Sequence, residues 1–125
     1  MKMIVSQMLV VAALVGAVML AACETSQPGV KSDGRRQWAT VHAAPPKAAE
    51  VAAAVLQELQ LKNVESKSTA VDGLATGFTA DETKISVSIE RAGPSSSEVT
   101  VTVGAFGDQS LGADILGRMQ KTISP

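Results

Sequence analysis

The sequence predicts an α+β domain: a two-layer sandwich in which two helices cover one face of an antiparallel sheet of about five strands, in the order β-α-β-β-β-β-α. Residues 85–90 and 99–103 alternate between apolar and polar side chains, which is typical of strands with one covered face. Residues 45–60 and 108–123 instead repeat their apolar side chains every three or four positions, as amphipathic helices do. A chain of 125 residues has room for one such domain.

The first strand and the first helix are expected on either side of a proline pair. Residues 37–43 read as the strand, and Pro45 and Pro46 cannot extend a ladder but suit the first turn of a helix. The apolar positions of the helix are Ala48, Val51, Ala52, Val55, Leu56 and Leu59. This stripe predicts that the helix packs on the sheet, and its alanines allow a close approach.

Two further strands are expected at residues 64–71 and 74–79, joined by a two-residue turn at 72–73 (Asp-Gly), a pair that readily adopts positive φ angles. The chain has one tryptophan, two phenylalanines and no tyrosine, so it offers little for a ligand platform of stacked aromatic rings. Trp38 and Phe78, which lie on predicted strands, are expected in the core.

The connection between the last strand and the last helix, VGAFGD at residues 103–108, is the most distinctive internal motif. Gly104 allows the backbone to leave the sheet, Gly107 permits an unusual φ angle, and Asp108 is expected as the helix N-cap. Phe106 is expected to fill the corner. In the alternative interpretation Phe106, Gly107 and Asp108 form an anion or partner site at the helix N-terminus.

The last helix is expected to depend on the sheet for its stability. Gly112 and Gly117 each cost about 1 kcal/mol relative to alanine in a helix interior. We expect these two glycines to mark where the helix approaches the sheet most closely.

The N-terminal segment reads as an export signal. Lys2 provides a positive start, residues 4–22 contain no charged side chain, and the run ends in small residues immediately before Cys23. This pattern predicts a signal peptide over residues 1–22, cleaved between Ala22 and Cys23. A run of this length also fits an uncleaved membrane anchor, which is the competing interpretation.

Leu20-Ala21-Ala22-Cys23 resembles the lipobox of bacterial lipoproteins, in which the cysteine thiol is alkylated by a diacylglyceryl group and becomes the new N-terminus. Alkylation requires a sulfur nucleophile, which explains a single cysteine at this point. The alternative is a buried or free exported thiol. Two acyl chains hold a protein stably in a bilayer. The resemblance implies lipid attachment at Cys23 and a cell-envelope location, with the domain on the periplasmic or outer side of the membrane.

Residues 23–36, which contain Pro28, Gly29 and Gly34, show no apolar period and are expected to form a flexible tether. Arg35 and Arg36 are expected to be solvated tether residues; contact with anionic headgroups is the alternative, although two charges make a weak patch. The folded domain is then expected over residues 37–125.

The residues that carry chemistry are few. His42 is the sole histidine and Cys23 the sole cysteine, so one chain cannot supply the histidine and cysteine ligands of a typical zinc site. We expect no catalytic residue, no metal and no cofactor; His42 is expected at an edge or on the surface, and Asp81 and Glu82 in a solvated turn. The net charge of −1 and the absence of a basic block argue against a nucleic-acid partner.

The order of these features, with AAPPKAAEVAAAVLQELQL and VTVTVGAFGDQSLGADILGRMQ, resembles an uncharacterised family of small bacterial lipoproteins known only as a domain of unknown function. The resemblance covers about residues 38–123 and implies an α+β fold in the envelope, but it brings no reaction or ligand. The expected function is therefore a membrane-anchored, non-enzymatic structural or adaptor module with an envelope protein as partner. The alternative is a periplasmic module that binds or hydrolyses a small ligand.

Overall fold

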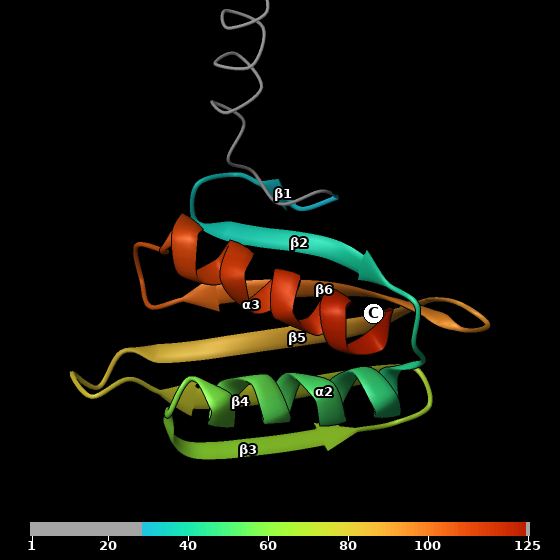
Figure 1. Cartoon of the computed structure of the whole chain (residues 1–125), viewed down its shortest axis with the longest axis horizontal. Coiled ribbons are helices and arrows are strands. Elements are labelled where there is room, and N and C mark those ends of the chain that lie inside the picture. The colour runs from blue at the N-terminus through green and yellow to red at the C-terminus, as the bar shows by residue number, and fades with distance from the viewer. Residues whose placement is uncertain (1–28, 125) are drawn as a thin grey trace, which may run out of the picture.

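The structure, a computed structural model, describes residues 29–124. Its strands and helices are β1 (Lys31–Ser32), β2 (Arg36–Val41), α2 (Pro45–Glu58), β3 (Lys62–Ser68), β4 (Asp72–Phe78), β5 (Lys84–Gly93), β6 (Ser96–Val103) and α3 (Gln109–Ile123). All neighbouring strands are antiparallel, in the order β1-β2-β6-β5-β4-β3, and both helices lie side by side on one face of the sheet (Figure 1). The α+β class is confirmed. The sheet has six strands rather than about five.

The additional strand, β1, lies within the segment that the sequence predicts as a tether. Lys31 pairs with Trp38 and Ser32 with Gln37, while Val30 packs against the core. The prediction that this segment carries no fold is therefore wrong from Val30 onward. Residues 23–28 of the predicted tether, like Ala22, Cys23 and the signal peptide, lie outside the described residues.

Both helices occupy the positions that their periodicity predicts. Helix α2 begins at the proline pair, with Ala44 as an N-cap that provides no side-chain hydrogen bond. Its buried residues are Pro45, Ala48, Ala49, Val51, Ala52, Val55 and Leu56. Helix α3 begins after Asp108, and its buried side is formed by Gly112, Ile115, Leu116 and Met119. The two buried stripes face each other and the sheet, and they form the core with the inward side chains of the strands.

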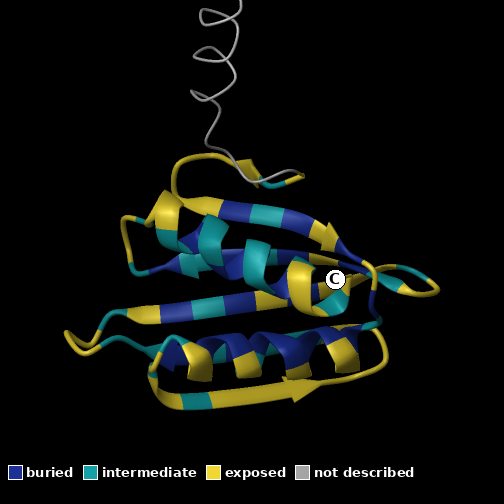
Figure 2. Ribbon diagram, viewed as in Figure 1, coloured by how far each residue is buried: buried dark blue, intermediate teal, exposed yellow. Residues whose placement is uncertain are grey.

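Alternation along the strands separates a dry face from an open one (Figure 2). In β2 the buried residues are Gln37, Ala39 and Val41, so Trp38 lies on the opposite, open face. Trp38 and Phe78 are only half-buried and do not belong to the core, which makes that prediction wrong. A strand exposes every second residue, and the inward positions of β2 are the odd-numbered ones.

The turn between β3 and β4 also differs from the prediction. Asp72 and Gly73 belong to β4, and the chain reverses over the three preceding residues. The amide of Thr69 donates to the carbonyl of Asp72 at 2.8 Å, and the Thr69 hydroxyl accepts from the amides of Val71 and Asp72, each at 3.2 Å. The threonine hydroxyl therefore organises this turn, rather than the Asp-Gly pair.

Candidate functional site

The loop between β6 and α3 closes on its own backbone. The amide of Gly104 donates to the carbonyl of Lys84 at 2.8 Å, and the amide of Gly107 donates to the carbonyl of Val103 at 2.9 Å. Both glycines have positive φ angles, +58° and +80°, as the sequence predicts. A Cβ at Gly107 would lie 2.6 Å from the carbonyl oxygen of Arg35, so only glycine allows this loop to approach the start of β2.

Asp108 is the N-cap of α3, as predicted. Its Oδ1 accepts a hydrogen bond from the amide of Leu111 at 3.0 Å. The carboxylate therefore stands at the helix N-terminus, where an anion would otherwise bind.

Phe106 does not fill the corner between β6 and α3, contrary to the prediction. Its side chain is 92% exposed, more than that of Val71, the other exposed large apolar residue among those described. The closure of the loop on its own backbone leaves the ring outside. Arg35 holds the loop from the side, since its Nη2 donates to the carbonyl of Ala105 at 3.1 Å. An aromatic ring is thus presented to solvent on a loop that is hydrogen-bonded on both sides.

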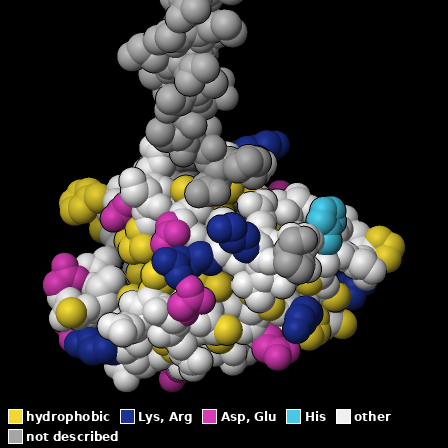
Figure 3. All heavy atoms as spheres, viewed as in Figure 1, with side chains coloured by type: hydrophobic (Ala, Val, Ile, Leu, Met, Phe, Trp, Pro, Cys, Tyr) yellow, Lys and Arg dark blue, Asp and Glu magenta, His cyan; other side chains and the backbone are white. Residues whose placement is uncertain are grey.

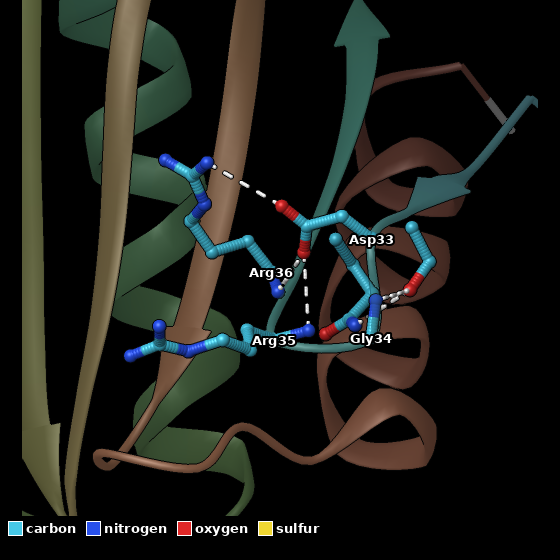
Figure 4. A network of polar contacts seen from close by, with 6 residues as sticks. Asp33, Gly34, Arg35 and Arg36 are labelled. Atoms are coloured by element: carbon cyan, nitrogen blue, oxygen red, sulfur yellow. Dashed lines mark hydrogen bonds and ion pairs between the residues drawn. The ribbon is translucent and has the colours of Figure 1, made fainter.

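The turn between β1 and β2 lies beside this loop and forms the second part of the candidate site (Figure 4). One carboxylate oxygen of Asp33 accepts from the amides of Arg35 at 3.0 Å and Arg36 at 2.7 Å, and the other accepts from the Arg36 guanidinium at 3.4 Å. The hydrogen bond from the Arg36 amide is the main reason that the pKa of Asp33 lies below its ordinary value. Between this turn and the β6–α3 loop lies a hollow of about 330 Å³.

The predicted tether over residues 23–36 includes Arg35 and Arg36, and the sequence gives no sign of the contact between Arg35 and the loop. The local signal was the pair Asp33-Gly34, in which the carboxylate binds the amides two and three residues ahead while Gly34 adopts a φ of +88°. The contact between Arg35 and Ala105 joins residues that are distant in sequence, so no local pattern could reveal it.

The other residues considered for chemistry lie where the sequence places them. His42 is exposed at the end of β2 and lines an open groove of about 400 Å³ beside the C-terminal half of α3. Asp81 lies in a turn and accepts hydrogen bonds from the hydroxyls of Thr79 and Thr83; the Thr79 bond is the larger cause of its lowered pKa. Glu82 forms an exposed ion pair with Lys62.

Within residues 29–124 no group of three His, Cys, Asp or Glu side chains is arranged to hold a metal ion. No helix in this described part of the chain is long and apolar enough to cross a membrane. On the helix-covered side, acidic and basic side chains are interspersed rather than gathered into one patch (Figure 3).

A second candidate site lies at the opposite edge of the sheet, along β3. Every residue of β3 is exposed except Val64, which is half-buried. Because the amide of Thr69 points to β4, the two-residue alternation directs the amides of Ser66 and Ser68 away from the sheet. Beside these serines a groove of about 440 Å³ runs between β3 and α2, and Ala49 and Ala53 form part of its wall.

The chain matches a protein family over most of its length. Residues 2–122 match the family described as "Protein of unknown function (DUF3568)". The chain belongs to this family. No curated protein matches the chain. The DUF3568 match covers residues 29–122 of the described domain and also extends over Cys23 and most of the segment before it.

Proposed function

We propose that this DUF3568 protein is a lipid-anchored, non-enzymatic adaptor of the bacterial cell envelope. In this proposal Cys23 carries the acyl chains, and the domain recruits a protein partner on the periplasmic or outer side of the membrane. The anchor is supported by the charged start, the apolar run and the sequence Leu20-Ala21-Ala22-Cys23. The family match begins at residue 2 and so includes the segment that contains this pattern.

The observation that carries the adaptor role is the open edge of β3. A partner strand can pair with the outward amides and carbonyls of Ser66 and Ser68 without displacing any strand of the sheet. Alternate side chains of that strand would then enter the groove between β3 and α2, where Ala49 and Ala53 leave room for apolar groups. Main-chain bonds would supply affinity, and the groove would supply specificity.

The same edge carries features that limit indiscriminate pairing. Lys62 and Lys67 are exposed on β3, and the register with β4 shifts between Lys62 and Glu65. Charged side chains and bulges of this kind reduce association between identical edges. A partner strand with acidic groups opposite Lys62 and Lys67 would pair favourably, whereas a second copy of this edge has one acidic residue, Glu65, to set against its two lysines.

Photo-crosslinking in intact cells tests the proposal. A photoreactive amino acid is placed either at Ser66, on the β3 edge, or at Ser88, which is exposed on the open face of β5. We expect a defined protein adduct from Ser66 and none from Ser88. If neither position yields an adduct, the adaptor role is wrong; an adduct from Ser88 alone would move the interface to the open face.

A proline substitution tests the hydrogen-bonding mode itself. With the photoreactive amino acid kept at Ser66, Ser68→Pro removes the neighbouring outward amide and leaves the ladder to β4 intact, so it should abolish the adduct while the circular dichroism spectrum stays that of the native fold. Ser68→Ala removes the hydroxyl and keeps the amide, so it should retain the adduct. Retention of the adduct in both variants would exclude strand addition.

A further inference from the structure

We propose that Phe106 and the arginines beside it contact the membrane surface directly, so that the β1 edge of the domain lies on a bilayer with anionic headgroups. This inference rests on the proposed function, because the lipid anchor at Cys23 is what brings the domain to the bilayer. The proposal concerns the loop at residues 104–108 and the turn at Asp33–Arg36.

The segment that joins Cys23 to the folded domain is short. Because Val30 packs on the core and Lys31–Ser32 pair with β2, the tether ends near Gly29 rather than at residue 36. From Cys23 to Gly29 the chain spans at most about 20 Å when fully extended. An acylated Cys23 would therefore keep the β1 edge within a short distance of the headgroups. A side chain on that edge would meet lipid more often than it would meet a protein farther from the membrane.

The exposed ring of Phe106 suits contact with a membrane surface. Phe106 is 92% exposed on a loop fixed by Gly104, Gly107 and Arg35, so its ring enters an interface without losing much conformational freedom. Phenylalanine is among the side chains by which interfacial segments enter the boundary between headgroups and acyl chains. A mobile loop would contribute less, because ordering it would oppose binding.

The side chains beside Phe106 also carry positive charge. The guanidinium groups of Arg35 and Arg36 extend to the same side of the turn, beside the hollow that also reaches Thr102 and Gly104 (Figure 4). Lys31, on β1, adds an exposed cation beside the turn. Basic side chains next to an apolar anchor attract anionic lipid headgroups.

The acidic groups near the loop offset one of the arginine charges and leave the other. Asp33 is paired with Arg36 and offsets its charge, and its carboxylate also accepts hydrogen bonds from the turn amides. Asp108 is directed to the amide of Leu111 at the start of α3. Arg35 has a carbonyl rather than a carboxylate as its partner, so its charge stays available to a phosphate.

The sheet order supports this orientation. β1 and β3 are the two outer strands of one sheet, so a bilayer at β1 leaves the β3 edge pointing away from the membrane (Figure 1). The proposed partner site would then remain open when the domain lies on the lipid.

Tryptophan fluorescence of the full-length, membrane-purified protein in vesicles tests the inference. The protein contains one native tryptophan, Trp38, which gives the background. Phe106→Trp is compared with Val71→Trp, since Val71 is 63% exposed in the turn at the opposite edge. In vesicles of phosphatidylcholine and phosphatidylglycerol with brominated acyl chains, we expect F106W to emit at shorter wavelength and to be quenched well beyond the wild-type background. V71W should match the background.

Charge variants test the role of the arginines. In the F106W protein, Arg35→Gln with Arg36→Gln should reduce quenching in anionic vesicles, and Arg35→Lys with Arg36→Lys should retain most of it. Lys62→Gln with Lys67→Gln removes the same charge from the β3 edge and should change nothing. Equal losses from both glutamine pairs would show that only the net charge matters and would overturn the assignment to this edge.

The possible results distinguish failure of the membrane contact from failure of the lipid anchor. The mass of the N-terminal peptide of the same preparation reports acylation independently of fluorescence. If the protein is acylated but F106W is no more quenched than V71W, the membrane contact is overturned and the anchor stays intact. The same conclusion follows if the F106W side chain is instead buried against a protein partner. An unacylated protein whose F106W is quenched on added vesicles supports the contact and removes the anchor.

Discussion

At the scale of single residues, the contact between Gln37 and Gly112 determines how closely α3 lies on β2. Gln37 is fully buried; its Nε2 donates to the hydroxyl of Ser32 at 3.0 Å, while its Oε1 has no partner among the described residues. A Cβ at Gly112 would lie 1.9 Å from that oxygen. The prediction that a glycine marks the closest approach of α3 is thus confirmed for Gly112, whereas Gly117 lines the open groove near His42.

Gly112→Ala should therefore destabilise the protein, although alanine is the better helix former. The substitution gains about 1 kcal/mol in helix propensity but overpacks the contact, which typically costs about 1–3 kcal/mol. We expect a net loss of about 1 kcal/mol in the free energy of unfolding, measured by urea denaturation. Gly117→Ala is the matched control and should be neutral or stabilising.

A double variant identifies the cause. Gln37→Ala removes the atom that the new Cβ would meet, so Gly112→Ala should cost less in the Gln37→Ala background than in the wild type. If the cost is the same in both backgrounds, the close contact described here does not determine the stability of α3.

At the scale of elements, the sequence predicts what has a repeating pattern and misses what does not. α2, α3, β5 and β6 are long enough for the periodicity of their apolar residues to show. β1 has two residues, too few for any period, and it depends on the Asp33 turn and on Ser32 binding Gln37. The β3–β4 turn was misplaced because the Thr69 hydroxyl competes with an Asp-Gly signal.

The turn between β1 and β2 should respond to pH through Asp33. Since hydrogen bonds from the Arg36 and Arg35 amides lower its pKa in the folded state, the carboxylate stabilises the fold above the ordinary aspartate value of about 3.9. This contribution is lost as the pH falls through the folded-state pKa. The difference in Tm between the wild type and Asp33→Asn should therefore be largest near neutral pH and should shrink below about pH 4.

Thermal melts of the two proteins across this range measure that difference. Other carboxylates titrate in both proteins and cancel from it. A difference that stays constant down to acidic pH would mean that the charge on Asp33 does not stabilise the turn.

At the scale of the whole molecule, the two ends of the sheet have different properties. The β1 edge carries the exposed Phe106 loop and its arginines, and the β3 edge carries open backbone groups beside a groove. Sequence alone could not provide this arrangement, because it depends on β2 pairing with β6, which joins residues such as Ala39 and Val99 that are distant in the chain. The sequence did indicate Phe106 as a candidate site residue, but not its exposure, and it indicated no residue of the β3 edge.

Acylation at Cys23 is what would hold the domain at the bilayer, where the proposed partner site and the proposed membrane contact both act. The most direct measurement is the mass of the N-terminal peptide of the protein purified from membranes. We predict a peptide that begins at Cys23 and carries a diacylglyceryl group on its sulfur, and we predict that Cys23→Ser leaves the precursor uncleaved. A peptide that begins at Met1 with an unmodified Cys23 would contradict the account.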